Sequence, residues 1–326
     1  MEISNKKVLI TGGLGFIGSN LARRLIGCGN SVTVVDSLIP EYGGNLRNLH
    51  DLRDKIVINL SDVRDPFSIN ELIKGQDYLF NLAGQTSHLD SMNDPFTDLD
   101  INAKAQLSIL EACRKNNRDI RIVFASTRQI YGKPQYLPVD EKHPLNPVDV
   151  NGINKIAGEQ YHLLYNQVHE IRSSVLRLTN TYGPRMRIKD ARQTFLGIWI
   201  RNLLQGKPIQ VYGDGQQRRD YNYVDDLVDA LIIAATESEA IGGVYNLGAT
   251  DPMSLSETAK IMCHEIKGAS WNLIPFPKDR KAIDVGDFIC DYSSFSSAFG
   301  WEPKIKFEEG IKRSLEYFRS ELEHYI

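Results

Sequence analysis

The amino-acid sequence predicts an α/β fold, a doubly wound parallel sheet followed by a smaller mixed α/β part, and three observations support this prediction. Short apolar runs alternate with amphipathic segments through the first half of the chain. These runs are continuously apolar, as strands are when helices cover both faces of a sheet. A glycine-rich segment follows the first run directly, where a strand would turn into a helix. Strand–helix–strand units of this kind assemble into a parallel sheet.

The first half of the chain supplies the expected sheet. Strands are expected at residues 8–10, 32–35, 56–58, 78–80, 121–125 and 174–178. Helices are expected between several of these strands, at residues 16–26, 66–74, 98–116 and 155–168. Parallel sheets of this type bind ligands beyond the carboxyl ends of their strands. We therefore expect functional side chains in the loops that follow the strands.

The pattern changes after residue 178. Helices are expected there at residues 194–204, 226–235 and from about 307 onward, and one short strand at residues 209–211. Irregular, proline-containing connections separate these elements. A length of 326 residues suits two domains. We predict a cofactor domain of residues 1–178 and a substrate domain of residues 179–326, with about 209–240 packing back on the cofactor domain.

Composition excludes several classes of protein. The chain is 42% hydrophobic and 24% charged, which excludes a disordered or fibrous protein. Because 38 basic residues face 41 acidic ones, we expect no nucleic-acid or membrane-surface partner. The four cysteines are scattered and the histidines form no ligand cluster, so we expect no metal. No apolar run could span a bilayer and no signal peptide is recognisable, so we expect a cytoplasmic protein.

The glycine-rich segment has the spacing of a dinucleotide-binding turn. Gly12, Gly15 and Gly18 form a GxxGxxG pattern, and Gly13, Gly15 and Gly18 also satisfy GxGxxG. Glycines here permit the tight turn, the approach of a pyrophosphate to the backbone, and the close packing of helix on strand. The start of the helix then faces the phosphates. The cofactor contacts expected from this turn are Gly12, Gly15, Phe16, Ile17 and Gly18.

Asp36 predicts which dinucleotide binds. It ends the second expected strand, 18 residues after Gly18, where a carboxylate can accept hydrogen bonds from the adenosine ribose. The carboxylate would repel a 2′-phosphate, and Ser37 and Leu38 offer no arginine to attract one, so we expect NAD rather than NADP. Asp62 and Val63 follow the third strand and are candidate adenine contacts, although Asp62 is equally consistent with a helix cap.

Further segments resemble the extended short-chain dehydrogenase/reductase family, and within it the NAD-dependent nucleotide-sugar epimerases and dehydratases. The resemblance rests on Thr11–Gly18, Leu82–Gly84, Ser126–Thr127, Tyr131–Gly132, Lys155 with Ala157–Glu159, Arg177–Asn180, Tyr182–Pro184, Arg219–Asp220, Tyr223–Asp226 and Gly300–Pro303. It covers nearly the whole chain. It implies a Rossmann-type sheet, an NAD that Leu82, Ala83, Gly84 and Lys155 also contact, and a nucleotide-diphosphate sugar as the substrate.

The resemblance also implies a catalytic set that this chain does not complete. The family uses a Ser or Thr, here Thr127, and a Tyr-x-x-x-Lys pair in which the phenolate takes a proton from the sugar hydroxyl. Lys155 matches the lysine, but Asn151 stands four residues before it, where the tyrosine belongs. An amide cannot shuttle protons near neutral pH. Losing a positioned acid/base typically costs about 10²–10⁴ in rate.

Three explanations of Asn151 stay open on the sequence alone. The proton carrier can be Thr127, a water held by Asn151 and Lys155, or Lys155 with a lowered pKa. The substrate can carry the proton on its own groups. Alternatively, the chain is a catalytically weak NAD-binding regulatory protein. The retention of Thr127, Lys155 and the substrate motifs favours an active enzyme.

The loops after the fourth and fifth strands hold further candidates. Arg128 and Gln129 stand where the family's sugar 4,6-dehydratases carry an Asp-Glu pair, which disfavours ordinary 4,6-dehydration. Arg128 is a candidate contact for an anionic substrate group. After the fourth strand, the candidate sugar contacts are Gln85, Ser87 and Ser91. His88 is a candidate acid/base, although a lone histidine is more often structural, and Asn102 is expected to be a buried structural amide.

The remaining candidates lie on the substrate side. By resemblance, Asn180 and Arg219 contact the substrate diphosphate, and a guanidinium suits a pyrophosphate because it donates two parallel hydrogen bonds. Arg280 or Lys281 is expected to close over the nucleotide. Segment 189–193, with Lys189, Arg192 and Gln193, is expected to line the base.

The leading hypothesis from the sequence is an NAD-dependent nucleotide-diphosphate-sugar epimerase that transiently oxidises the sugar, at C4. A net nucleotide-sugar dehydrogenase or 4-ketoreductase is the enzyme alternative. The resemblance also implies a homodimer held by a four-helix bundle, formed from the helices expected at 98–116 and 155–168.

Overall fold

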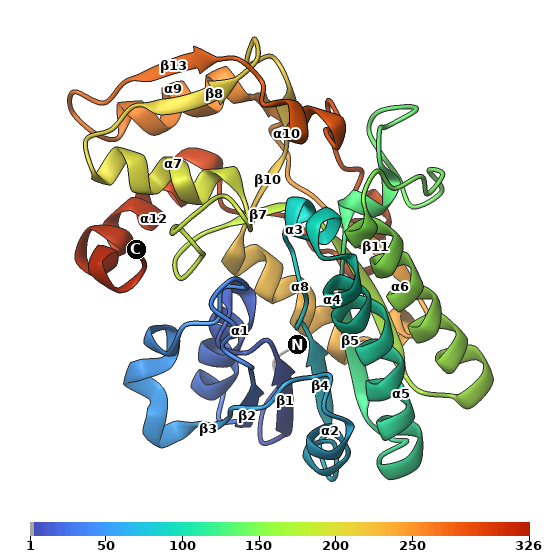
Figure 1. The fold of residues 1–326 in the computed structure, drawn as a ribbon. Helices are drawn as coiled ribbons and strands as arrows, with labels where there is room; N and C mark the ends of the chain where they lie inside the picture. Colours follow the sequence, from blue (N-terminus) through green and yellow to red (C-terminus); the bar gives the residue numbers. More distant parts are fainter. Residues whose placement is uncertain (1–2) are drawn as a thin grey trace.

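A parallel sheet of seven strands lies at the centre of the computed structural model, which describes residues 3–326 (Figure 1). The strands are β1 (Lys7–Thr11), β2 (Ser31–Val35), β3 (Val57–Asn59), β4 (Tyr78–Asn81), β5 (Arg121–Thr127), β6 (Ser173–Leu178) and β11 (Val244–Leu247). Their order across the sheet is β11-β6-β5-β4-β1-β2-β3. The direction of strand order reverses between β1 and β4, and a sheet of this kind binds its ligand beyond the carboxyl ends of the strands at that point.

Helices cover both faces of this sheet, because successive side chains of each strand point to opposite sides. Val8 and Ile10 belong to the core under α1 (Phe16–Gly27) and α8 (Val224–Thr236). Leu9 belongs to the core on the other face, under α2 (Pro66–Leu72), α5 (Ala105–Asn116) and α6 (Val150–His169). Figure 1 shows α5 and α6 side by side along one flank of the sheet.

The six strands expected from the sequence are confirmed, and two of the helices differ from the expectation. The helix expected at 98–116 is divided into α4 (Pro95–Leu99), a π-helical turn at Asp100–Lys104, and α5. Helix α6 begins earlier than expected, because the Asp149 carboxylate accepts a hydrogen bond from the Gly152 backbone N–H and caps the helix there. Asn151 therefore lies in the first turn of α6.

The seventh strand, β11, comes from residues beyond the expected domain boundary at 178. The connection that leads to it includes α8, which packs against α1. Of segment 209–240, α8 is the part that lies on the sheet, whereas β8 (Ile209–Tyr212) pairs with β13 (Trp271–Ile274) outside it. The chain thus leaves the sheet after β6 and returns to it as β11, which pairs with β6 in parallel at the edge of the sheet.

A cap that includes α7, α9, β8 and β13 lies at the carboxyl edge of the sheet (Figure 1). β7 (Asn180–Tyr182) pairs with β10 (Tyr221–Tyr223), and β9 (Arg218–Arg219) pairs with β12 (Met253–Ser254). The other helices are α3 (His88–Asn93), α7 (Phe195–Leu204), α9 (Leu255–His264), α10 (Lys278–Ala282), α11 (Ser293–Phe299) and α12 (Phe307–Glu321). Short 3-10 segments lie at Leu46–Lys55, Arg128–Tyr131, Ser238–Ala240 and Leu322–His324. No helix of residues 3–326 is long and apolar enough to cross a membrane.

A buried ion pair links the sheet to α6. Arg177 on β6 donates to both carboxylate oxygens of Glu159, with Nη2 2.8 Å from Oε2, and the Ser126 hydroxyl donates to the same carboxylate. The Arg177 guanidinium also donates to the Tyr131 hydroxyl, which donates in turn to Asn246 on β11. The network therefore joins the helix layer, the central strands and the edge strand.

We expect Glu159→Ala to lower the free energy of unfolding by about 3–5 kcal/mol, because it leaves the buried Arg177 without its counter-ion. Urea unfolding followed by circular dichroism measures the effect. Glu309→Ala is the matched control, since Glu309 pairs with Arg313 on the exposed face of α12 and should matter much less. Equal losses in the two variants would contradict the structural importance of the buried pair.

Candidate active site

A cavity of about 120 Å³ lies at the carboxyl ends of β1, β2 and β4. It brings together the residues that the sequence predicted for the cofactor, apart from Lys155: Gly12, Gly15, Phe16, Ile17, Gly18, Asp36, Asp62, Val63, Leu82, Ala83 and Gly84. The sequence analysis missed other lining residues, among them Tyr42, Thr86 and Ile101, because nothing in their local sequence distinguishes them. Gln193, which we expected near the nucleotide base, lines both this cavity and the larger one described below.

The glycine turn is shaped as a phosphate cradle. Gly12 has a φ of +68°, which disfavours any residue with a side chain. A Cβ at Gly18 would collide with the Gly12 carbonyl oxygen, so the turn and the start of α1 can pack this closely only with glycine. Gly15 caps α1 without a side chain, which leaves the N-terminus of the helix open to an anion.

The two acidic residues of this cavity are held differently. Asp36 accepts hydrogen bonds from the backbone N–H groups of Leu14 and Leu38, at 3.1 Å and 3.0 Å. Burial raises the pKa of the Asp36 carboxyl, and these two bonds only partly offset that effect. Asp62 instead forms two hydrogen bonds with the guanidinium of Arg64, which lower its pKa. Because the Asp62 carboxylate is already paired with Arg64, Asp36 is the better placed of the two to accept hydrogen bonds from a ribose.

Lys155 lies directly beneath Gly84. Its Nζ donates to the Ala125 carbonyl oxygen (3.0 Å) and sits over the Phe124 ring. A Cβ on Gly84 would come within 3.2 Å of that Nζ, so the absence of a side chain there leaves the ammonium close to the cofactor cavity. Burial lowers the pKa of Lys155 to about 8, against the opposing effect of nearby carboxylates. The cradle, the ribose carboxylate and this lysine together fit a dinucleotide.

The side-chain amide nitrogen of Asn151 makes structural hydrogen bonds. Its Nδ2 donates to the Gln85 carbonyl oxygen (2.7 Å) and to the buried carboxylate of Asp98 (3.1 Å). Asn102 also donates to the Gln85 carbonyl oxygen, at 2.9 Å, which confirms it as a buried structural amide. The Asn154 side chain donates to the other oxygen of Asp98. Both N–H groups of Asn151 are therefore in use, and they hold the Gln85 backbone and the Asp98 carboxylate.

Two of the expected sugar contacts lie away from open space as well. Gln85 is buried, and its side-chain amide donates to the Ser87 carbonyl oxygen. Ser91 is buried, and its hydroxyl donates to the His88 carbonyl oxygen. Thr127 accepts a hydrogen bond from the Gln129 backbone N–H and thereby caps the 3-10 segment that follows β5. Within residues 3–326, none of these three side chains is among those that line the larger cavity.

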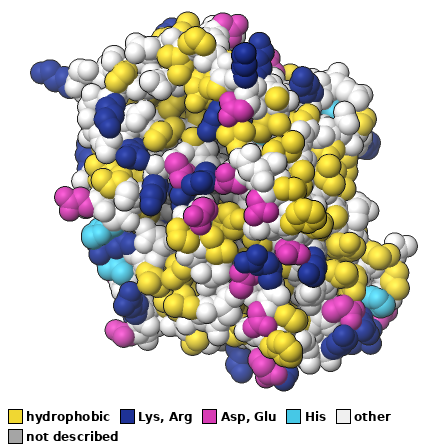
Figure 2. Space-filling model, in the orientation of Figure 1, with side chains coloured by type: hydrophobic (Ala, Val, Ile, Leu, Met, Phe, Trp, Pro, Cys, Tyr) yellow, Lys and Arg dark blue, Asp and Glu magenta, His cyan; other side chains and the backbone are white. Residues whose placement is uncertain are grey.

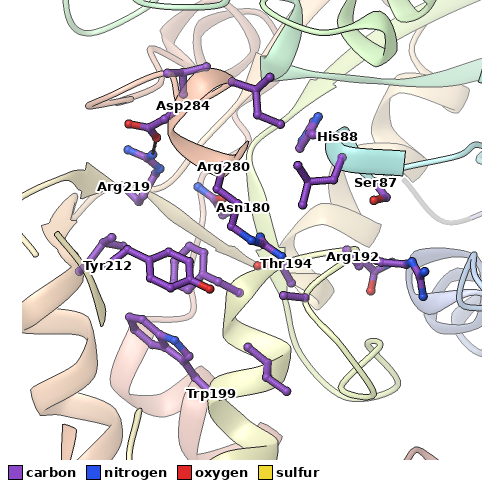
Figure 3. Close-up of a pocket in the computed structure, with 18 of the residues that line it drawn as sticks. Ser87, His88, Asn180, Arg192, Thr194, Trp199, Tyr212, Arg219, Arg280 and Asp284 are labelled. Carbon is purple, nitrogen blue, oxygen red and sulfur yellow. Dashed lines mark ion pairs between the residues drawn. The ribbon is translucent and has the colours of Figure 1, made fainter. Parts of the chain in front are cut away.

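The larger cavity, of about 580 Å³, lies between the sheet and the cap (Figure 3). It brings together the other predicted substrate residues: Ser87, Arg128, Asn180, Arg192, Arg219 and Arg280. Figure 3 shows Arg219, Asp284 and Tyr212 on one side and Ser87, His88 and Arg192 on the other. Its lining also includes Trp199, which the sequence analysis missed. Figure 2 shows basic and acidic side chains gathered together across this face of the molecule.

Buried guanidinium groups make part of this cavity positive. Arg128 Nη2 lies 3.3 Å from the Asn180 side-chain oxygen, while Nη1 is buried with no hydrogen-bond partner in the described chain. Burial, reinforced by nearby Arg219, lowers the pKa of Arg128 to about 10. Arg219 is held by the carbonyl oxygens of Arg218 and Gly286. Two largely desolvated cations of this kind are suited to an anionic ligand.

The charged residues nearer the rim of the cavity are paired. Arg192 Nε donates to Asp90 (2.7 Å), so the arginine expected near the base joins the cap to α3. Arg280 lies over the Tyr212 ring, 6.0 Å from its centroid.

Burial raises the pKa of Asp220, just beneath the cavity, to about 6, although Arg128 opposes this effect.

His88 begins α3 and lines the larger cavity. Its Nδ1 lies 2.9 Å from Oδ2 of Asp149. The sequence analysis identified His88 as a candidate but missed Asp149, whose only local signal is its position before a helix. Within residues 3–326, no group of three or more His, Cys, Asp and Glu side chains is arranged to hold a metal.

Comparison with known proteins agrees with this geometry. Residues 8–248 match the model of the NAD-dependent epimerase/dehydratase family, and the chain belongs to that family. NAD is therefore its cofactor, as the sequence predicted, and the Rossmann-type fold of the extended short-chain dehydrogenase/reductases is confirmed.

Named relatives within the family differ in reaction. A Methanocaldococcus jannaschii protein, named provisionally as a UDP-glucose 4-epimerase, is 33% identical over 96% of this chain and 98% of its own length. UDP-glucuronic acid decarboxylase 1 of Xenopus tropicalis is 31% identical over 99% of this chain and 74% of its own. The structure of the Thermotoga maritima UDP-glucose 4-epimerase with UDP-glucose superimposes with a TM-score of 0.87, at 30% identity, over 97% of this chain and 99% of the other.

We expect Asp36→Ala to weaken NAD binding by about tenfold or more, because charge-assisted hydrogen bonds to the ribose are lost. Binding of NADP should weaken less, so the preference for NAD should fall. Calorimetric titration with each dinucleotide measures both affinities. Asp54→Ala, which removes an exposed carboxylate, is the control. An unchanged NAD-to-NADP ratio in Asp36→Ala would show that Asp36 does not select the cofactor.

Proposed function

We propose that this chain is an NAD-dependent nucleotide-diphosphate-sugar epimerase that transiently oxidises the sugar, at C4. The observation that carries the proposal is the way the two cavities meet. The segment after β4 lines the cofactor cavity with Gly84 and Thr86 and the larger cavity with Ser87 and His88. A sugar in the larger cavity would therefore lie beside the reactive end of the cofactor. When bound, NAD would take up a hydride from the sugar carbon and return it.

The larger cavity supports a nucleotide-diphosphate sugar as the ligand. Arg219 is buried and forms an ion pair with Asp284 in which Nη2 and the carboxylate are 3.7 Å apart, whereas half-buried Arg128 has no ion pair within residues 3–326. They suit a diphosphate. Asn180 lies beside Arg128 and is anchored by a hydrogen bond to the Asp220 carbonyl oxygen. Trp199, Tyr212 and Phe195 offer apolar surface to a base and a sugar.

The residues after β5 argue against 4,6-dehydration. Arg128 and Gln129 occupy the positions at which the dehydratases of the family carry their carboxylates. Gln129 lines the larger cavity, but its side-chain amide donates to Asp149 and cannot act as an acid. Epimerisation needs one proton carrier and no second acid/base pair, so the present residues suit it better. Net dehydrogenation or 4-ketoreduction would use the same cavities and is distinguished by experiment.

The exposed face of α6 supports a homodimer as part of this proposal. Ile153, Leu164 and Val168 lie on one side of the helix and are 56%, 50% and 59% exposed. Phe96 and Leu99 on α4 are 77% and 44% exposed. Leu110 on α5, by contrast, is buried in the core. A cytoplasmic location and a role in carbohydrate biosynthesis belong to the same proposal.

The reaction is tested by incubating the protein and NAD with a panel of UDP-, GDP-, CDP- and dTDP-sugars. We expect an epimer product without net accumulation of NADH. Net NADH formation, or loss of CO₂ from a uronic acid, would show a different reaction of the same family. Binding without conversion of any panel member would point to the regulatory alternative.

Lys155→Ala should lower kcat by about 10²-fold or more, because the cofactor-side ammonium is lost. Binding of the same sugar nucleotide, measured by calorimetry, should change much less. Lys142→Ala, which changes an exposed lysine in the loop before α6, is the control. Undiminished turnover in Lys155→Ala would refute the assigned site.

Ile153→Glu combined with Leu164→Glu should convert the dimer to a monomer, because charges would have to be buried in the apolar interface. Sedimentation velocity measures the change. The control is Leu273→Glu, which changes an exposed leucine away from α6 and should leave the mass of the particle in solution equal to that of wild type. A wild-type monomer would contradict the proposed dimer.

A further inference from the structure

His88 and Asp149 form a pair at the boundary of the larger cavity. The His88 side chain is 36% exposed and lines the cavity, whereas the Asp149 side chain has no exposed surface. The Asp149 Oδ2 atom lies 2.9 Å from Nδ1 of His88 as an ion-pair contact, and the buried Nδ1 makes no hydrogen bond within residues 3–326. Nε2 lies on the other side of the imidazole. A buried carboxylate beside a partly exposed imidazole is suited to positioning the histidine for acid/base chemistry.

The Asp149 carboxylate is fixed in place by the protein. One oxygen accepts from the Gly152 backbone N–H at 2.8 Å and caps α6. The other accepts from the Gln129 side-chain amide at 2.9 Å and faces His88. Burial alone would raise the pKa of Asp149, but the His88 contact and these hydrogen bonds hold it below its usual value. The carboxylate therefore stays ionised behind the imidazole.

The other groups considered as proton carriers are held by structural hydrogen bonds. Both N–H groups of Asn151 are bonded, to Gln85 and to Asp98. Lys155 is buried beneath Gly84 and donates to a backbone carbonyl oxygen. The Thr127 hydroxyl accepts a hydrogen bond from the Gln129 backbone N–H, and within residues 3–326 it is not among the side chains that line the larger cavity. At the start of α3, His88 and Asp90 both line this cavity, and Asp90 is paired with Arg192.

We propose that His88 replaces the missing tyrosine as the proton carrier of this enzyme, and that Asp149 positions its ring. The inference rests on the proposed function. As the sugar carbon is oxidised, the proton of its hydroxyl moves to Nε2 of His88, a carbonyl forms, and the hydride with its electron pair leaves for NAD. As the hydride returns to the carbon, Nε2 gives the proton back to the oxygen. Asp149 keeps its charge throughout.

The pair explains why a carboxylate stands at position 149. An ionised carboxylate beside Nδ1 favours the tautomer with its hydrogen on Nδ1, which leaves a lone pair on Nε2 to accept a proton. It also stabilises the imidazolium that forms. The helix cap alone does not require a carboxylate, because Asn also caps helices. The second carboxylate oxygen accepts from Gln129 and lies beside His88.

Variants of His88 test the proton transfer on the panel member that the wild-type enzyme converts. His88→Gln and His88→Ala should each lower kcat by about 10²–10⁴-fold, with a much smaller effect on binding measured by calorimetry. Added imidazole should restore part of the activity of His88→Ala. His264→Gln, which changes an exposed histidine at the end of α9, is the control. A kcat of His88→Gln within threefold of wild type, or no rescue by imidazole, would overturn the proposal.

Asp149→Asn tests the positioning role without any ligand. Nitrogen-15 NMR of histidine-labelled protein above neutral pH should show the His88 hydrogen on Nδ1 in wild type. It should move toward Nε2 in Asp149→Asn, which keeps the cap and the fold. The same ring tautomer in both proteins would overturn the role of Asp149. If wild type converts no panel member, the proposed function fails, and this measurement still decides whether Asp149 orients His88.

Discussion

The site depends on one carbonyl oxygen. Asn102 and Asn151 both donate to the backbone oxygen of Gln85, from the π-helical turn before α5 and from the first turn of α6. A buried carbonyl must be paired, and each such bond contributes about 0.5–1.5 kcal/mol net. Together they fix the segment that follows β4. Gly84 is thereby held over Lys155, and Ser87 and His88 are directed into the larger cavity.

This bonding gives the unusual asparagine a structural reason. A tyrosine at position 151 would bring a proton carrier, but it could not donate two hydrogen bonds to Gln85 and Asp98. Asp98 is fully buried, and it needs the amides of Asn151 and Asn154 because a buried carboxylate without donors is very costly. The chain therefore has an amide network where the family resemblance implies a catalytic phenol. Proton transfer must then come from another element, and α3 supplies His88.

The cofactor site followed from the sequence more fully than the substrate site did. Gly12, Gly18 and Asp36 lie in local patterns whose spacing reflects a turn and a strand end, so they could be assigned without a structure. Gln85 and Ser91 were expected to contact the sugar, because they follow a strand at the ligand-binding edge. Their side chains turn inward, and a short loop gives no sequence signal of which side chains do so. Arg128 and Arg219 were expected to meet substrate, and they line the cavity.

The sequence by itself determined the class of fold, the dinucleotide turn and the absence of the catalytic tyrosine. Each of these depends on residue types at short, fixed spacings along the chain. Only the tertiary structure decided that β11 is the edge strand, that the Asn151 amide nitrogen donates two hydrogen bonds, and that Asp149 contacts His88. These pairings join residues far apart in the chain. Their partners are set by how helices pack on the sheet, and no local pattern records that packing.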